Sequence, residues 1–475
     1  MYLDGMRFSL MSIATGLAVF CTGPSLLGQT AELLETRSEF QVQALANALS
    51  LPDGILPVDH AVAKYRVQYP MEYNGTTHTV SAALFVPVED SGTTVECALP
   101  THTYMHGTLF LRDDAPSYDG FEGELGFLMA TGGALCLMPD YLGLGSSTEV
   151  LHPYCHAASE AESGIALLDA VSALQGELGI GLNGQHFVSG YSQGGHAAMA
   201  MAKRMQEDPD AGYPLAGAAP MSGPYDMSGT QLPAGFAEEQ YSNPAYLAYI
   251  LLAWQQSYGN LFVDLGEIFQ DPYAAGLTDL FDGETDGDVI NNFLAGPTAD
   301  IVQPGALEGL MAEGHPFLAA AQDNDVYAWV PESPVQMYYC TQDEQVFYDN
   351  ALVAEAWMND NGAEQVTTVD GGPLDHGQCA LLAILGGTVW INAQADLCNP
   401  TSVGETAADA LTWRPDGEQV LVHGLPEGTS WTVFGLDGRV VQAGTGGADP
   451  LRLNLPSGLF LLVEASGQSV RMAVD

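Results

Sequence analysis

The sequence around Ser192 constrains the fold more than any other stretch of the chain. The pentapeptide Gly190-Tyr-Ser-Gln-Gly194 follows an apolar run at 185–189 that is typical of a strand, and small residues typical of a helix follow at 195–206. G-x-S-x-G between a strand and a helix predicts a turn so tight that the serine takes strained backbone angles. The glycines prevent clashes with neighbouring backbone, so the serine can stand at the end of the strand.

Strands and helices alternate over residues 60–400. A helical spacing of leucine and valine appears at 157–174, between runs that are typical of strands. Such alternation predicts an α/β protein with a mostly parallel sheet and helices on both faces, whose active site lies at the carboxyl ends of the strands. The strand-like runs lie at 84–86, 98–105, 134–138, 185–189 and 334–340.

Residues 223–330 interrupt this alternation. They are rich in aromatic and helix-forming residues, and we interpret them as a mostly helical cap inserted into the sheet domain. The loop at 282–288 begins like a calcium-binding loop. However, the twelfth position counted from Asp282 is Phe293 rather than an acid, so we expect a solvated turn.

A serine hydroxyl becomes a good nucleophile only when a base takes its proton and an acid orients that base. In a strand–turn–helix setting of this kind, the chain order is serine, acid, histidine. Asp343 follows the run at 334–340 and is the expected acid, with Glu344 and the more distant Asp349 as alternatives. Asp343 would stand just past the carboxyl end of that strand, where an orienting acid belongs.

His376 is the expected base. It lies in the loop after a predicted last strand at 366–369, and it is the only histidine between Asp343 and His423 near the C-terminus. Asp375 directly precedes it, and because adjacent residues rarely hydrogen-bond in the required geometry, we expect Asp375 to shape the turn instead.

Two backbone N–H groups are needed to hold an oxyanion. One comes from the residue after the nucleophile, which is Gln193. We expect the other at Thr108, in the loop after the run at 98–105, where Gly107 would permit a close approach. We expect His106 to be structural.

No motif predicts a metal or a cofactor. His102 and His106 are four residues apart, a spacing that brings side chains together on a helix but not on a strand. His152, Cys155 and His156 form a short cluster that could bind zinc, but no fourth ligand is evident.

The charge of the chain excludes several partners. There are 11 basic and 59 acidic side chains, which gives a net charge of −48. Without a basic stripe, binding to nucleic acid or to an anionic membrane surface is excluded, and phosphate or sulfate esters are disfavoured as substrates. A hydrophobic content of 47% is enough to bury a sizeable core.

The N-terminal residues 1–28 are typical of a signal peptide. Arg7 is followed by an apolar run at 8–20, which is too short to span a bilayer, and cleavage is plausible after Gly28. Met6 would give a cleaner start than Met1, and a buried N-terminal helix is the alternative. We therefore expect a protein that is secreted or held at the cell surface after passing through the periplasm, with no integral membrane segment in the mature chain.

Cleavage of that signal would leave six cysteines, which allow many pairings. Cys379 and Cys398 flank a predicted helix and are our first candidates for a disulfide. Cys136 and Cys340 lie inside apolar strand-like runs, where we expect buried free thiols.

Over roughly residues 60–395 the chain resembles the α/β-hydrolase superfamily, and within it the secretory lipase-like serine esterases. The resemblance implies an eight-stranded sheet, a helical cap over the site and hydrolysis of carboxylic esters through an acyl-enzyme. It rests on Met105-His-Gly-Thr108, Pro139-Asp-Tyr-Leu-Gly-Leu-Gly145, His152-Pro-Tyr154, Gly190-Tyr-Ser-Gln-Gly194, Asp343 and Asp375-His-Gly377.

The last part of the chain, 418–475, follows a linker-like segment at 401–417. Alternating strand patterns around an Asp437-Gly438 turn predict a small β-sandwich. The stretches 431–441, 453–463 and 469–472 resemble the C-terminal sorting domain of proteins exported by the bacterial type IX system, which implies that secretion machinery as a partner. A carbohydrate-binding or adhesive module is the alternative, but the aromatic residues follow core spacing.

Together these patterns predict an exported serine hydrolase with a catalytic domain at 29–400 that cleaves small-molecule or lipid carboxylic esters. Ser192 would attack, His376 would shuttle the proton and Asp343 would orient His376. A peptidase similar to prolyl oligopeptidases would use the same residues, but no propeller-like repeat is evident. A non-catalytic surface-binding protein on a hydrolase fold is the other alternative.

Overall fold

The computed structural model describes residues 28–51, 54–118, 120–209 and 212–398, and seven short segments between 412 and 474. The expected signal peptide lies outside the described residues, apart from its last position, Gly28. So do the first part of the expected linker and the Asp437-Gly438 turn.

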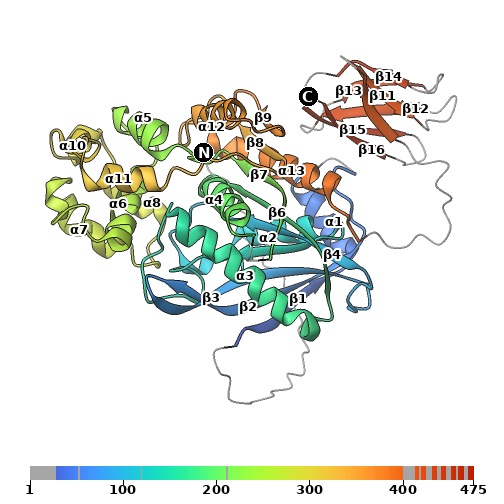
Figure 1. The fold of residues 1–475 in the computed structure, drawn as a ribbon, viewed down its shortest axis with the longest axis horizontal. Helices are drawn as coiled ribbons and strands as arrows, with labels where there is room; N and C mark the ends of the chain where they lie inside the picture. The colour runs from blue at the N-terminus through green and yellow to red at the C-terminus, as the bar shows by residue number, and fades with distance from the viewer. Residues whose placement is uncertain are drawn as a thin grey trace.

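A nine-stranded sheet forms the centre of the molecule (Figure 1), in the order β1-β2-β3-β5-β4-β6-β7-β8-β9. Strands β4 to β9 run parallel, whereas β1, β2 and β3 are antiparallel to their neighbours. The predicted mostly parallel sheet is confirmed, and the strand beyond the expected eight is the edge strand β1. The bounds are β1 (Thr30–Arg37), β2 (Ala61–Tyr73), β3 (Thr76–Val88), β4 (Ala98–Met105), β5 (Leu135–Pro139), β6 (Gly181–Tyr191), β7 (Leu215–Met221), β8 (Val335–Tyr339) and β9 (Val366–Asp370).

Each face of the sheet has its own hydrophobic core. Successive residues of a strand point to opposite faces, and in β5 Leu135 and Leu137 enter one core while Cys136 and Met138 enter the other. The first core is closed by α3 (Ala157–Leu178), α4 (Gln193–Glu207) and α12 (Asp349–Asp360). The second is closed by α1 (Glu39–Ala48), α2 (Phe121–Ala130) and α13 (His376–Gln394).

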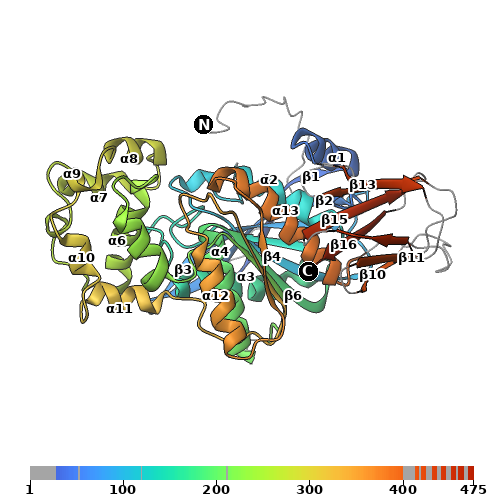
Figure 2. The ribbon, with the colours of Figure 1, turned by 90° about the horizontal axis from the view of Figure 1, so that it is seen from above.

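A group of helices separates β7 from β8 and occupies the stretch interpreted as a cap. It has a core of its own, and its helices gather at one end of the molecule (Figures 1 and 2). The loop that resembled a calcium site is a turn, in which Asp282 accepts from the N–H groups of Glu284 and Thr285. The cap helices are α5 (Leu232–Ala237), α6 (Pro244–Tyr258), α7 (Tyr273–Leu280), α8 (Gly287–Phe293), α9 (Thr298–Ile301), α10 (Ala306–Leu310) and α11 (Pro316–Asp323).

The disulfides differ from the expected pairing. The bonds are Cys97–Cys398 and Cys340–Cys379, so both the Cys379–Cys398 pair and the free Cys340 are wrong. Cys379 lies on the first turn of α13 and Cys398 lies beyond its last, so the helix holds them roughly 20 Å apart, too far for a disulfide. Cys136 is a buried free thiol, as expected.

The C-terminal strands form two small antiparallel sheets. β10 (Thr412–Asp416), β11 (Gln419–His423) and β14 (Leu451–Leu453) form one. The other contains β12 (Ser430–Gly435), β13 (Val440–Thr445), β15 (Gly458–Glu464) and β16 (Ser469–Val474). Trp431 is buried in their shared core, as its spacing predicted. Because β10 pairs with β11, the β region begins at residue 412, inside the segment expected to be linker.

Within the part of the chain that the structure describes, no helix combines the length and the apolar character needed to cross a bilayer.

Candidate active site

The turn between β6 and α4 presents Ser192 at the carboxyl edge of the sheet. Ser192 has φ 62° and ψ −123°, in the left-handed half of the backbone map that residues with a side chain rarely enter. Its N–H donates to the carbonyl of Met221 on the neighbouring strand at 2.9 Å. A Cβ at Gly190 or Gly194 would overlap carbonyl oxygens of the turn and of Met105, so both glycines of the motif are required by close backbone approach.

The structure brings Ser192, His376 and Asp343 together. The Nε2 atom of His376 lies 2.9 Å from Ser192 Oγ, and its Nδ1 atom lies 2.7 Å from Asp343 Oδ2. A carboxylate only accepts, so Nδ1 carries the proton and Nε2 offers a lone pair to the Ser192 hydroxyl. The other Asp343 oxygen accepts from the N–H groups of Gln345 and Val346, at 3.0 and 2.8 Å, which fixes the carboxylate.

Of the three acids considered, only Asp343 contacts the imidazole. A Glu344 carboxylate oxygen accepts from the backbone N–H of His376 at 3.1 Å, so it holds the main chain of that residue. Asp349 lies at the start of α12. Asp375 accepts from Gln378 N at 2.8 Å and caps α13, and this is the turn-shaping role expected from the sequence.

Two further links hold the histidine-bearing segment against the sheet. The Tyr191 hydroxyl, next to the nucleophile, donates to the carbonyl of His376 at 2.6 Å. The buried Cys340–Cys379 disulfide joins the end of β8 to the first turn of α13, and so connects the segments that carry Asp343 and His376. The sequence analysis missed this bond.

The loop after β4 passes beside the nucleophile. A Cβ at Gly107 would lie 3.9 Å from the Ser192 Cβ, so the backbone of this loop is within van der Waals reach of the nucleophile. The Gly107 N–H donates to the half-buried Glu122 carboxylate at 3.0 Å, whereas the Thr108 N–H donates to no acceptor among the described residues. Gln193 is the first residue of α4, where N–H groups lack a partner within the helix. Both backbone donors predicted for an oxyanion therefore lie on segments next to Ser192.

Glu122, the acid beside this loop, is largely shielded from water. Burial raises the pKa of Glu122, while hydrogen bonds from Tyr104 and the Gly107 N–H oppose the rise. The ring nitrogens of His106 lie 2.7 Å from the Gly107 carbonyl and 3.2 Å from the Asp140 carbonyl, and a neutral ring donates to only one of the two. His102 contacts Ser189. Burial lowers the pKa of His106 to about 4 and that of His102 to about 3, so both are neutral at pH 7.

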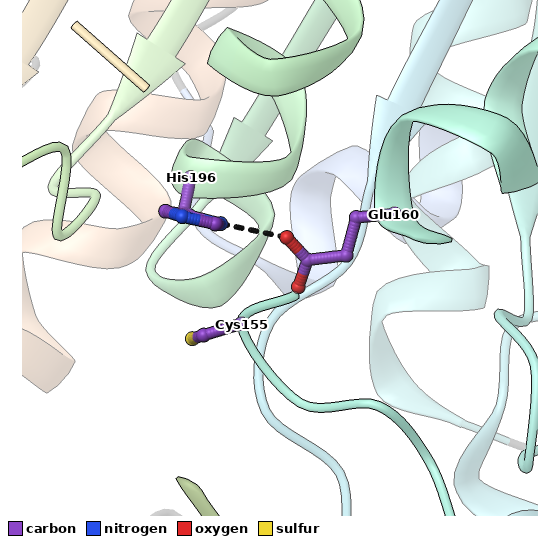
Figure 3. Close-up of side chains that lie close together, drawn as sticks. All are labelled: Cys155, Glu160 and His196. Atoms are coloured by element: carbon purple, nitrogen blue, oxygen red, sulfur yellow. Dashed lines mark hydrogen bonds and ion pairs between the residues drawn. The ribbon is translucent and has the colours of Figure 1, made fainter. Parts of the chain in front are cut away.

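The structure separates the three residues weighed as zinc ligands. His152 contacts the Gln193 side chain at 2.7 Å, and His156 caps the N-terminus of α3. Cys155 lies instead with Glu160 and His196, all three buried and with ligand atoms within 4.8 Å of one another (Figure 3).

The cluster of Cys155, Glu160 and His196 does not fit a metal ion. The Nδ1 atom of His196 lies 2.7 Å from Glu160 Oε2 (Figure 3). Its Nε2 atom lies 2.9 Å from the Asn324 carbonyl, so both nitrogens face acceptors. Desolvation lowers the pKa of His196, but the charge and hydrogen bond of Glu160 outweigh it and raise the value overall. An imidazole that donates through both nitrogens has no lone pair for a metal.

The cap contains a cavity that is partly open to solvent. Its walls are mostly apolar, with Phe236, Leu247 and Ile250 among them. Two further lining residues, Gln231 and Tyr241, donate to the Gln345 carbonyl at 2.8 and 2.6 Å, and the Gln345 N–H bonds Asp343. The rim of the cavity therefore lies beside the loop that carries Asp343.

The sheet, the elbow and the inserted helices define an α/β-hydrolase fold.

No protein-family model and no curated protein sequence matches the chain, but solved structures do. A rice cell wall degrading esterase, LipA of Xanthomonas oryzae, is 26% identical with a TM-score of 0.68, covering 78% of this chain and 97% of its own. A Legionella pneumophila protein described as a hydrolase is 25% identical with a TM-score of 0.69, covering 77% of this chain and 97% of its own. Candida antarctica lipase A in its closed state, at 14% identity and a TM-score of 0.56 over 79% of this chain and 83% of its own, shares the fold alone. The likenesses at 25–26% identity support an ester hydrolase.

Proposed function

We propose that the protein is a serine hydrolase that cleaves carboxylic esters through an acyl-enzyme. The observation that carries this proposal is the hydrogen-bonded chain from Ser192 through His376 to Asp343 at the carboxyl edge of the sheet. The similarity to an esterase structure at 26% identity and to a hydrolase structure at 25% identity supports the same reaction class.

In the proposed reaction, Ser192 Oγ attacks the ester carbonyl while its proton passes to His376 Nε2. The N–H groups of Gln193 and Thr108 stabilise the oxyanion that forms. When the carbon–oxygen bond to the alcohol breaks, His376 returns the proton to the leaving oxygen. A water molecule then attacks the acyl-enzyme by the same steps and releases the acid, while Asp343 keeps the imidazole in the required tautomer throughout.

The proposed substrate is a neutral ester with an apolar chain. The apolar walls of the cap cavity and its position beside the Asp343 loop support this choice, since such a cavity favours hydrocarbon over charge. The net charge of −48 further disfavours an anionic substrate.

We also propose that the protein works outside the cytoplasm, exported by way of residues 1–28 and the C-terminal β region acting as a type IX sorting domain. Its two disulfides, Cys97–Cys398 and Cys340–Cys379, support an oxidising compartment, because such bonds are rare where thiols are kept reduced.

A panel of nitrophenyl esters of increasing acyl length, with a peptide anilide as the comparison substrate, tests the function. We expect hydrolysis of the esters, preference for apolar chains over charged ones, and covalent labelling of Ser192 by a fluorophosphonate probe. Cleavage of the peptide alone, or no labelling of folded protein, would overturn the proposal.

A further inference from the structure

Behind the elbow, a continuous chain of buried polar groups includes the side chain of Gln193. None of its members is more than 2% exposed. It begins at the carbonyl of Leu142, runs through four side chains and ends at the carbonyl of Asn324, directly after the last cap helix. The four side chains are His152, Gln193, Glu160 and His196, with successive polar atoms 2.7 to 2.9 Å apart.

The donors and acceptors of this chain determine one arrangement of protons. His152 Nδ1 faces the Leu142 carbonyl and must donate to it, so His152 Nε2 accepts. Glu160 Oε1 is also an acceptor, and both acceptors lie within 2.9 Å of Gln193 Nε2. The amide of Gln193 is thus held by both of its N–H bonds, and rotating it would place its oxygen against a lone pair and a carboxylate.

Gln193 Oε1, in contrast, is buried and has no hydrogen-bond partner among the described residues. A buried amide oxygen without a partner is energetically costly, so packing alone does not account for this side chain. The same residue supplies, through its main chain, one of the two N–H groups proposed to hold the oxyanion. The two hydrogen bonds that the Gln193 side chain donates, to His152 and Glu160, can orient that backbone N–H.

We propose that Glu160 is a positioning residue for the oxyanion site, acting with His152 through the side chain of Gln193. The inference rests on the proposed function. Glu160 touches no reacting atom, and His196 fixes its second oxygen from the side nearest the cap. Because an oxyanion contact forms only in the transition state, misalignment of the Gln193 N–H lowers kcat and leaves KM unchanged.

The Glu160→Leu variant removes both carboxylate oxygens and replaces them with an apolar side chain of similar size. We expect kcat on a nitrophenyl ester to fall about 10-fold to 100-fold with KM retained, less than the loss for deleting an oxyanion donor outright. Affinity for a trifluoromethyl ketone, which forms a tetrahedral oxyanion on the serine, falls by the same factor. Affinity for the product alcohol does not change. An unchanged kcat in folded Glu160→Leu protein would overturn the proposal.

Two further variants separate positioning from general destabilisation. Glu160→Gln keeps an acceptor for Gln193, and we expect it to restore kcat to within about threefold of wild type. Ser163→Ala, on the same helix, removes a buried hydrogen bond to the Ser159 carbonyl at 2.9 Å without touching Gln193, and we expect kcat to stay at the wild-type value. Loss of kcat in Ser163→Ala equal to that in Glu160→Leu would overturn the proposal.

A double-mutant cycle supplies the decisive measurement. Gln193→Leu keeps the backbone N–H and removes the side chain through which Glu160 acts. In the Gln193→Leu background, we expect Glu160→Leu to change kcat by less than about twofold, because the side chain that connects Glu160 to the oxyanion site is already absent. Multiplicative losses would overturn the proposal. If Glu160→Leu does not fold, Gln193→Leu alone carries the test: we expect it to lower kcat about 10-fold to 100-fold, and an unchanged kcat would overturn the proposal. If wild-type protein hydrolyses no ester, the proposed function is wrong. If wild-type protein hydrolyses esters but the two losses in kcat multiply, only the positioning role of Glu160 is wrong.

Discussion

The two halves of the candidate site are built in different ways. On one side, Ser192 is held by backbone alone, in a strained turn between β6 and α4 where glycines let chain segments touch. On the other side, Asp343 lies in the loop after β8 and His376 is the first residue of α13, and a side-chain hydrogen bond and a disulfide join these segments across 33 residues of sequence. The difference teaches that the nucleophile is placed by local geometry, whereas the acid and base depend on remote partners.

The largest loss of kcat is expected in the half of the site that contains Ser192. Ser192→Ala removes the proposed nucleophile and should lower kcat on nitrophenyl esters by about 10⁶-fold. Because the hydroxyl does not hold the turn, the thermal unfolding midpoint should equal or exceed that of the wild type. Turnover within tenfold of wild type would show that Ser192 is not the nucleophile, and a large drop in the midpoint would remove the contrast between the two halves.

On the side held by side chains, Asp343→Asn should lower kcat by about 10⁴-fold. The asparagine oxygen can still accept from Gln345 and Val346, but its NH₂ faces His376 Nδ1 and favours the wrong tautomer. The nitrogen shifts of His376 in an NMR spectrum would report the change. Activity close to wild type would indicate that another acid orients the imidazole.

Removing the disulfide between the two loops should have a smaller effect. The double variant of Cys340→Ala and Cys379→Ala should lose about 2–4 kcal/mol of unfolding free energy in urea, and kcat should fall because the acid and base segments are no longer joined. The matched control replaces Cys97 and Cys398 with alanine. It should lose stability as well but keep kcat while folded, so equal kcat in the two double variants would contradict the proposed link.

The smallest effect is expected for Glu344→Gln. Its carboxylate accepts from the backbone N–H of His376 and from the side-chain amide of Gln345, both at 3.1 Å. The amide oxygen of the variant can still accept one of these bonds, so about 1 kcal/mol of stability and less than about tenfold in kcat should be lost. Asp370→Asn, which weakens an exposed turn contact to Gly372 at 2.7 Å, serves as the comparison. A loss from Glu344→Gln as large as that from Asp343→Asn would mean that both acids act on the imidazole.

The same contrast explains what could be predicted from the sequence. Ser192 could be predicted because its motif and both flanking elements lie within about twenty residues of sequence. The α/β alternation could be predicted from strand and helix periodicity. His376 followed from chain order. The cysteine pairing was wrong because closeness along the chain was taken for closeness in space, and the straight helix α13 holds Cys379 and Cys398 apart.

The buried chain behind the elbow was missed for a related reason. Its members come from four separate segments. His152 stood out in the sequence as a candidate zinc ligand and as part of His152-Pro-Tyr154, and neither pattern indicates a contact with Gln193. One signal was available, because Glu160 falls on the same helical face as Gly164, Leu167 and Val171, where an acid would need a buried partner. The identity of that partner depends on tertiary packing.

The Cys97–Cys398 bond, which spans 301 residues of sequence, has a consequence for proteolysis. It closes most of the hydrolase domain, including every cap helix, into one covalent ring. A protease that cuts a cap loop opens the ring without releasing a fragment, and the two pieces separate only after reduction. A cut beyond Cys398 releases the C-terminal β region and leaves the ring whole.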